Sequence, residues 1–270
     1  MDHLLREKAP ITSAGWEEID DEAKGRLTTY LAARKLVDFA GPSGWGYSAT
    51  NLGRVTKVSK APTDGVTARQ RRVLPLVELR AEFTVSRTEV DDVDRGAADS
   101  DFDDLDRAAH RIALGENIAV FHGYKAAGIT GIAEASSHEA IDFDGKFEGS
   151  PTVVAKAVDV LRQSGIDGPY GLAIGPAGYT GIIETTEHGG LLLLDHLRQI
   201  LGGPVVWAPG VEGGVVLSLR GGDFVLDSGQ DISIGYLDHD ADSVRLYFEE
   251  SFSFRVLEPD AAIPVRLVRS

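Results

Sequence analysis

The chain has 270 residues, 43% of them hydrophobic and 26% charged, and its formal net charge is −15. This balance is typical of a globular chain with one large domain or two smaller ones. The absence of cysteine excludes disulfides, thiol catalysis and cysteine metal sites. An acidic surface repels phosphate groups, so nucleic-acid binding by the whole surface is disfavoured.

Residues 1–8 are charged and no apolar run follows them, so we expect no signal peptide. No run of the chain is apolar over the length that a bilayer requires. Together these features favour a cytoplasmic protein without membrane contacts.

An amphipathic helix is predicted from residue 12 or 13 to about residue 39, where Gly41 and Pro42 end it. Its apolar stripe comprises Trp16, Ile19, Ala23, Leu27, Tyr30, Leu31 and Val37. Acidic side chains come early in this helix, and Arg34 and Lys35 come late. That order complements the helix dipole.

Residues 54–72 differ from the rest of the acidic chain because they are basic. They contain Arg54, Lys57, Lys60, Arg69, Arg71 and Arg72 against a single acid, Asp64. Pro62 and the Asp64-Gly65 pair indicate a turn in the middle. We therefore predict an extended two-stranded arm that lies on an acidic neighbouring subunit. The alternative is a floppy surface hairpin.

Residues 73–90 alternate between apolar and polar side chains, which predicts a strand, and residues 91–101 form an acidic loop. A long helix is predicted over residues 100–128, with Ser100 as its cap and Gly128 as its end. This helix would be a spine beside which sheets and arms lie. An ordinary core helix is the alternative.

Strands alternate with helices over residues 134–219, which indicates a small α/β subdomain. The predicted helices cover residues 150–161, 178–186 and 191–201, and the predicted strands cover residues 170–174, 205–207 and 215–219. The chain then returns to strands at 231–237 and 243–257, which pair across Asp238-His239-Asp240. The last apolar segment, residues 263–268, is expected to be tucked in.

No residue pattern predicts catalysis. The histidines are His3, His110, His122, His138, His188, His196 and His239, and none has the spacing of a zinc-binding helix. Gly175, Gly178 and Gly181 lack the Lys-Ser/Thr ending of a phosphate loop. No nucleophile elbow is present. We therefore expect neither a catalytic nor a metal site, and no enzyme activity.

Several stretches of the chain resemble the encapsulins, which are bacterial shell proteins with the fold of tailed-phage major capsid proteins. The stretches are REKAPITSAGWEEIDDEA (residues 6–23), RKLVDFAGPSGWGY (34–47), LPLVELRAEFTV (74–85), GPYGLAIGP (168–176), RGGDF (220–224), GQDISIGY (229–236) and VRLYFEESFSFRV (244–256). They keep the order of the family and span nearly the whole chain.

The resemblance implies an α+β fold of the tailed-phage major capsid type. Its peripheral domain would comprise residues 1–53, 73–133 and 220–270, its extension loop residues 54–72, and its apical domain residues 134–219. The implied assembly is a closed icosahedral shell of the smallest size class, with 60 copies of one subunit.

The resemblance further implies that the shell encloses a cargo enzyme, either a dye-decolourising peroxidase or a ferritin-like iron-handling protein. The cargo would be bound through a C-terminal targeting peptide in a groove on the inner wall. Transferred to this sequence, the groove residues are Leu31, Arg34, Asp38, Asp231, Ile232 and Ile234. Taken alone, Arg34 and Asp38 also fit an intrahelical i,i+4 pair.

Two further expectations follow from the resemblance. The loop of residues 185–190 would line a pore at the fivefold vertex, with Glu187, His188, Gly189 and Gly190 admitting small solutes; an exposed tight turn is the alternative. Some relatives bind a flavin beside a tryptophan just after the LPLVELRAEFTV stretch. Arg87 stands at that position here, so we expect no flavin and no other cofactor.

Three other classes of protein compete with this interpretation. A phage capsid protein shares the fold but packages DNA, which the acidic composition disfavours. A bacteriocin or protease needs a nucleophile with its base, and none was found. A free-standing binding protein for small ligands fits poorly with a basic arm and a long helix.

Overall fold

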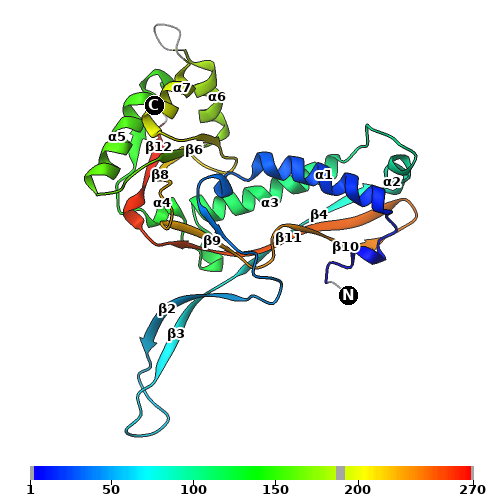
Figure 1. The fold of residues 1–270 in the computed structure, drawn as a ribbon, viewed down its shortest axis with the longest axis horizontal. Helices are drawn as coiled ribbons and strands as arrows, with labels where there is room; N and C mark the ends of the chain where they lie inside the picture. Colours follow the sequence, from blue (N-terminus) through cyan, green and yellow to red (C-terminus); the bar gives the residue numbers. More distant parts are fainter. Residues whose placement is uncertain (1–2, 187–191, 269–270) are drawn as a thin grey trace.

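The computed structural model describes residues 3–186 and 192–268 and has three parts: a body, an arm and a second α/β unit (Figure 1). The body contains a five-stranded sheet. Its strands are β1 (Asp38–Ala40), β9 (Phe224–Ser228), β11 (Ser243–Val256), β10 (Ser233–His239) and β4 (Val77–Ser86). The long strand β11 organises this sheet, because it pairs antiparallel with β10, β4 and β9.

Two helices lie side by side on this sheet, α1 (Ser13–Tyr30) and α3 (Asp103–Phe121). The short helix α2 (Arg87–Asp94) joins β4 to the segment before α3. Ile19, Leu105 and Phe248 are almost fully buried in the core between helices and sheet. This amphipathic packing is what the helical apolar stripes predict.

The spine helix is shorter than the predicted 100–128. It begins at Asp103 and ends at Phe121, and Ser100 does not cap it. At 1.5 Å per residue its length is about 28 Å. The helix ends because Gly123 adopts a φ of 91°. Gly123 also packs closely on Gly131: a Cβ atom at position 123 would lie 2.9 Å from the backbone nitrogen of Gly131. A short 3-10 turn, η3 (Lys125–Ala127), follows.

The first helix also ends earlier than predicted. Thr12 caps it as expected, accepting a hydrogen bond from the Gly15 N–H at 3.1 Å. The helix ends at Tyr30, and the chain continues as the 3-10 turn η2 (Ala33–Lys35) and the strand β1. A second 3-10 turn, η1 (Arg6–Lys8), precedes the helix.

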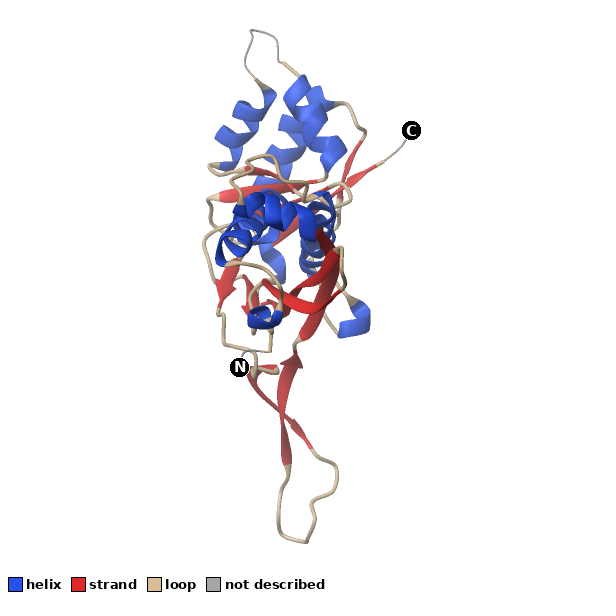
Figure 2. Ribbon diagram, turned by 90° about the vertical axis from the view of Figure 1, so that its right-hand side faces the viewer, coloured by secondary structure: helices blue, strands red, loops and turns tan. Residues whose placement is uncertain are grey.

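The predicted two-stranded arm is confirmed as a structure. It is formed by β2 (Ala49–Lys57) and β3 (Arg69–Pro75), which pair antiparallel and project from the body (Figures 1 and 2). The arm therefore begins before residue 54 and ends after residue 72. The strand predicted over 73–90 is divided between β3 and β4, and the acidic loop predicted at 91–101 begins inside α2.

The second unit is a five-stranded sheet covered by helices. The strand order is β5 (Ile141–Phe143), β12 (Ala262–Leu267), β8 (Gly214–Ser218), β6 (Tyr170–Ile174) and β7 (Val205–Trp207). The helices are α4 (Ile132–Ala135), α5 (Ser150–Gln163), α6 (Pro176–Glu184) and α7 (Leu193–Leu201), and the 3-10 turns are η4 (Phe147–Gly149) and η5 (Pro259–Ala261). The predicted α/β alternation is thus present.

The last strand differs from the predicted grouping of residues 220–270 with the body. Strand β12 lies between β5 and β8 in the second sheet. Ala262 and Ile263 are fully buried there, because this sheet provides partners on both sides of the strand. The expectation that residues 263–268 are tucked in is therefore correct only for their start, which is buried in the second unit, whereas Leu267 and Val268 are 44% and 41% exposed.

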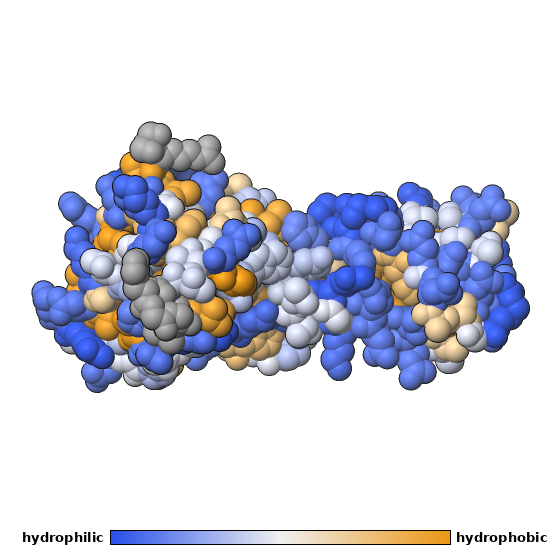
Figure 3. Space-filling view, turned by 90° about the horizontal axis from the view of Figure 1, so that it is seen from above, coloured by the Kyte–Doolittle hydropathy of each residue, from blue (hydrophilic) through white to orange (hydrophobic). Residues whose placement is uncertain are grey.

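The surface differs between the two units. Viewed from above, apolar side chains gather over the second unit, whereas the surface over α1 is mostly hydrophilic (Figure 3). Ile183 and Leu192 are exposed apolar side chains of the second unit, at 50% and 49%. None of the helices in the described residues is long and apolar enough to cross a membrane.

Candidate functional site

A groove of approximately 590 Å³ lies between α1, the segment that carries η1, and the start of β10. One face of α1 forms its first wall, because Asp20, Ala23 and Leu27 recur at helical spacing, and Leu31 follows directly after the helix. Opposite them are Asp231, Ile232, Ser233 and Ile234, and Phe248 of β11 lies at the floor. The floor is apolar, and charged side chains stand at the edges.

The groove ends at the turn η2, which is held by the buried side chain of Asn117 of α3. The Asn117 Oδ1 accepts hydrogen bonds from the N–H groups of Ala32 at 3.0 Å and Ala33 at 3.1 Å. Its Nδ2 donates to the carbonyls of Tyr30 at 2.9 Å and Pro209 at 3.0 Å. These bonds replace the i−4 bonds that would have continued α1, so the chain turns here and Arg34 points into the site.

The Arg34 guanidinium is surrounded by three carboxyl groups. Its Nε donates to Glu116 Oε2 at 2.8 Å, its Nη1 to Asp231 Oδ1 at 2.7 Å, and its Nη2 to Glu250 Oε2 at 3.2 Å. Burial alone would lower the pKa of Arg34, but Glu116, Glu250 and Asp231 raise it above its ordinary value. Arg34 is therefore a fixed positive charge at the end of the groove.

Two of these carboxyl groups are buried in the protein interior. Glu116 of α3 is 0% exposed and Glu250 of β11 is 1% exposed, and the Oε1 atom of each is buried without a hydrogen-bond partner. Burial, followed by the charge of Glu116, raises the pKa of Glu250 well above its ordinary value. One guanidinium is thus shared by a buried pair of carboxyl groups, and burial makes Glu250 hold its proton more tightly than an exposed carboxyl group does.

The next residue of the strand, Glu249, is also fully buried but faces the other side of the sheet. It forms an ion pair with Arg80 of β4 and a hydrogen bond with His3, whose Nε2 lies 3.1 Å from Glu249 Oε1. His3 in turn stacks on Trp45, with ring centroids 3.9 Å apart. These contacts attach the N-terminal segment, one wall of the groove, to the central strand.

The edges of the groove carry both signs of charge. Arg6 donates to both carboxylate oxygens of Asp20, at 3.1 and 2.6 Å, and lies over the ring of Trp16. Lys35 donates to the carbonyl of Thr29 at 3.2 Å, and partial burial lowers its pKa. An apolar groove with a few placed charges is suited to an extended or coiled peptide segment.

The structure brings together five of the six residues predicted for the groove: Leu31, Arg34, Asp231, Ile232 and Ile234. Asp38 is the exception, because it lies on β1 outside the groove, where its Oδ2 accepts a hydrogen bond from the Gly222 N–H at 2.5 Å. The alternative of an intrahelical pair between Arg34 and Asp38 is also wrong, since no helix connects them.

Glu116, Asn117 and Glu250 are the site residues that the sequence reasoning missed. The sequence does contain a signal for two of them. Glu116 follows Leu105, Ala109 and Ile112 in the phase of the apolar stripe, and Glu250 stands between Phe248 and Phe252 on the apolar face of its strand. A charged residue in phase with a buried stripe indicates a buried charge that needs a partner.

The basic arm residues are all exposed. These are Arg54, Lys57, Lys60, Arg69, Arg71 and Arg72. Apolar side chains of the arm are exposed with them, including Val55 at 51% and Val73 at 48%. Val55 pairs with Arg71, and Lys57 pairs with Arg69. The two-stranded arm therefore carries positively charged and apolar side chains next to each other. Such a surface suits an acidic partner.

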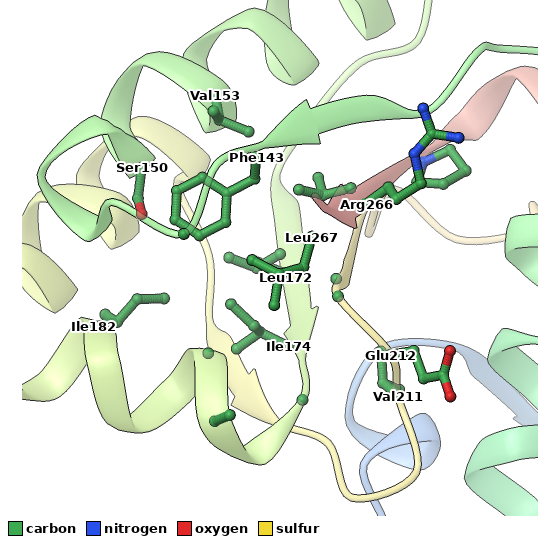
Figure 4. A pocket seen from close by; sticks show the side chains of 18 of the residues that line it. Phe143, Ser150, Val153, Leu172, Ile174, Ile182, Val211, Glu212, Arg266 and Leu267 are labelled. Carbon is green, nitrogen blue, oxygen red and sulfur yellow. The ribbon is translucent and has the colours of Figure 1, made fainter. Parts of the chain in front are cut away.

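A second hollow, of approximately 950 Å³, lies in the α/β unit (Figure 4). Phe143, Leu172, Ile174, Ile182 and Leu267 surround it, so its walls are mainly apolar. His122 lies near its rim, where its Nε2 accepts a hydrogen bond from the Glu212 N–H at 3.0 Å. Burial lowers the pKa of His122.

The remaining predictions concern the lining of a pore, the absence of a metal site and the absence of a cofactor. Glu187, His188, Gly189 and Gly190, predicted to line a pore, lie outside the described residues. Within residues 3–186 and 192–268, no group of three or more histidine, aspartate and glutamate side chains could hold a metal ion. Arg87 begins α2 and donates to the carbonyl of Asp240 at 3.4 Å. The absence of flavin stays a prediction.

The chain has a capsid-like fold. It matches a virus-like particle from Pyrococcus furiosus with a TM-score of 0.65, over 92% of this chain and 98% of that one, at 17% sequence identity. It also matches the capsid of an empty GTA particle with a TM-score of 0.54, over 88% of this chain and 90% of that one, at 14% identity. The predicted capsid-type fold class is confirmed.

Sequence comparisons define the family. The family Linocin_M18, described as an encapsulating protein for peroxidase, matches residues 1–253. A type 1 encapsulin shell protein from Rhodospirillum rubrum is 49% identical, over 98% of this chain and 97% of that protein. One from Mycolicibacterium paratuberculosis is 43% identical, over 98% and 99%. The chain belongs to the encapsulin shell protein family, as its resemblance predicted.

Proposed function

We propose that this chain is the shell subunit of a nanocompartment in the cytoplasm, and that the groove beside α1 binds the C-terminal targeting peptide of an enclosed enzyme. The observation that carries the proposal is the convergence of Leu31, Arg34, Asp231, Ile232 and Ile234 on one groove. These residues come from two segments nearly 200 positions apart in the sequence. Their apolar floor and fixed charges suit a short peptide.

The proposed cargo is a dye-decolourising peroxidase, and the family description as an encapsulating protein for peroxidase supports it. A ferritin-like iron-handling protein is the second candidate. The shell itself acts as a container rather than as a catalyst.

The proposed assembly is a closed icosahedral shell of the smallest size class. Two surfaces support self-association: the exposed basic arm on an otherwise acidic chain, and the apolar surface of the second unit (Figure 3). Heterologous contacts of this kind close into a shell when the same interface repeats around symmetry axes. In this assembly Glu187 and His188 would line the pore that admits small solutes.

The groove is tested by filling it without disturbing the shell. Thr28 is exposed and lines the groove, whereas Thr29 is exposed and does not. Each hydroxyl bonds only to the carbonyl four residues earlier, at 2.7 and 3.2 Å. Thr28→Trp should therefore block the groove, and Thr29→Trp is the matched control, because it adds the same side chain about 100° around the helix.

The probe is a fluorescent protein that carries the C-terminal segment of a dye-decolourising peroxidase, co-expressed with the shell. The readout is fluorescence per particle after the shells are purified, and electron microscopy verifies that they are intact. We expect the Thr28→Trp shells to be empty and the Thr29→Trp shells to be filled. Filled Thr28→Trp shells would exclude this groove as the peptide site.

A further inference from the structure

Most of the residues that hold Arg34 do not line the groove. The turn η2 has only three residues and does not fix a long side chain by itself, since an arginine loses much conformational freedom when it is ordered. Asn117 uses both donors and its acceptor on the backbone of this turn and its surroundings. The backbone that carries Arg34 is thus attached to α3.

The guanidinium is held by the same helix. Glu116 precedes Asn117 on α3, and its Oε2 contacts both Nε and Nη2 of Arg34, at 2.8 and 2.7 Å. Glu250 of β11 contacts Nη2 from the sheet. Asp231 is the one carboxylate of the set that reaches the groove, with its side chain 42% exposed. Arg34 is therefore placed from α3 and the sheet.

We infer that Glu116, Asn117 and Glu250 are positioning residues of the groove, which fix Arg34 in the geometry that the bound peptide meets. The inference rests on the proposed function of the groove. If Arg34 is already ordered before the peptide binds, binding does not have to restrict this side chain, so less conformational entropy is lost on binding.

The carboxyl pair makes this positioning dependent on pH. The charged groups that face Glu250 are Glu116 from α3, Arg34 from η2 and Asp231 before β10. Opposite Glu250 on β4 is Leu79, which does not titrate, and Glu249 and Arg80 form the next pair along the same strands. When rising pH ionises Glu250, Glu250 and Glu116 become two buried carboxylates that repel each other. Both then attract the Arg34 guanidinium more strongly, which draws it away from Asp231 at the edge of the groove.

The inference is tested by reassembling shells with the fluorescent probe described above over a series of pH values. In wild-type shells the retained probe should decrease as the solution becomes alkaline. In Glu250→Gln shells, where a neutral amide replaces the protonated carboxyl, that decrease should disappear while loading is retained. Glu116→Gln should lower loading about tenfold, because it removes a charge-assisted bond to Arg34, and Glu116→Asp should restore part of it.

Asp103→Asn is the matched control, because it removes a carboxylate from an exposed position of the same helix. It should leave loading and its pH dependence unchanged. If Thr28→Trp empties the shells but both glutamine variants keep the wild-type loading and pH profile, the positioning role is refuted and the groove function stands. If Thr28→Trp shells stay filled, the groove function fails and the positioning role fails with it.

Discussion

Glu116 and Asn117, consecutive residues of α3, hold the same three-residue turn in two different ways. Glu116 bonds to the side chain of Arg34 at 2.8 Å, and Asn117 bonds to the backbone of Ala32 and Ala33 at 3.0 and 3.1 Å. Both residues are fully buried. One turn of the spine helix therefore sets both the path of the chain after α1 and the position of the charge at the end of the groove.

Asn117 should be among the positions most sensitive to substitution. Asn117→Ala leaves the N–H groups of Ala32 and Ala33 and the carbonyls of Tyr30 and Pro209 without partners, which should cost about 3 kcal/mol. Asn117→Asp keeps the acceptor but places a buried carboxylate beside two carbonyl oxygens, so it should cost more. The check is the apparent melting temperature at one fixed protein concentration, because assembly couples to stability. A melting temperature of Asn117→Ala equal to that of Asp103→Asn would contradict this prediction.

Arg34 and Glu116 should be coupled in a double-mutant cycle. Arg34→Met leaves Glu116 and Glu250 buried without a cation, and breaking a buried pair in this way should cost about 3 kcal/mol. Adding Glu116→Gln removes one of the stranded carboxyl groups, so the double variant should be more stable than Arg34→Met alone. Strict additivity of the two changes in unfolding free energy would show that the pair does not interact.

The sequence predicted best those elements whose apolar pattern is complete within the element. The strands at 170–174 and 205–207 have the predicted bounds, because each is a short buried apolar run between turns. The arm was predicted for the opposite reason, since it has too few apolar residues to be buried. In both cases the local composition is sufficient to determine the structure.

The helix ends could not be predicted in the same way. The helical pattern continues past Tyr30 through Leu31 and Val37, but the N–H groups of Ala32 and Ala33 bond to Asn117, which is 84 or more positions away. A contact at that distance is invisible to a local pattern. The groove was predicted from family resemblance, whereas Glu116 and Glu250 were missed because charge alone does not reveal burial.

Glu250 should make stability decrease with rising pH. Its pKa is raised in the folded chain, so the folded state binds the proton more tightly than the unfolded state. Its stabilising contribution is therefore complete below the ordinary carboxyl range and is lost as pH rises toward the raised pKa. Melting temperatures of wild type and Glu250→Gln should diverge over this window, with the variant showing the smaller decrease. Parallel pH profiles would show that Glu250 does not titrate there.

The basic arm should govern assembly through charge. Arg69 and Arg71 are exposed on β3, and the chain as a whole has a net charge of −15, so the arm should be attracted to a neighbouring copy. Arg69→Glu with Arg71→Glu should replace that attraction by repulsion and yield small oligomers with a folded core. Light scattering measures the particle mass, and circular dichroism verifies the fold.

Gln70→Glu is the control for the arm, because Gln70 lies between the two arginines on the same strand. This substitution adds a negative charge without removing a positive one. It should weaken assembly less than the double reversal. Rising salt screens exposed charges over a Debye length of about 10 Å at 0.1 M. Salt should therefore weaken wild-type assembly and partly restore the charge-reversed variant. Wild-type-sized particles of the double variant at low salt would show that the arm's charge does not contribute to assembly.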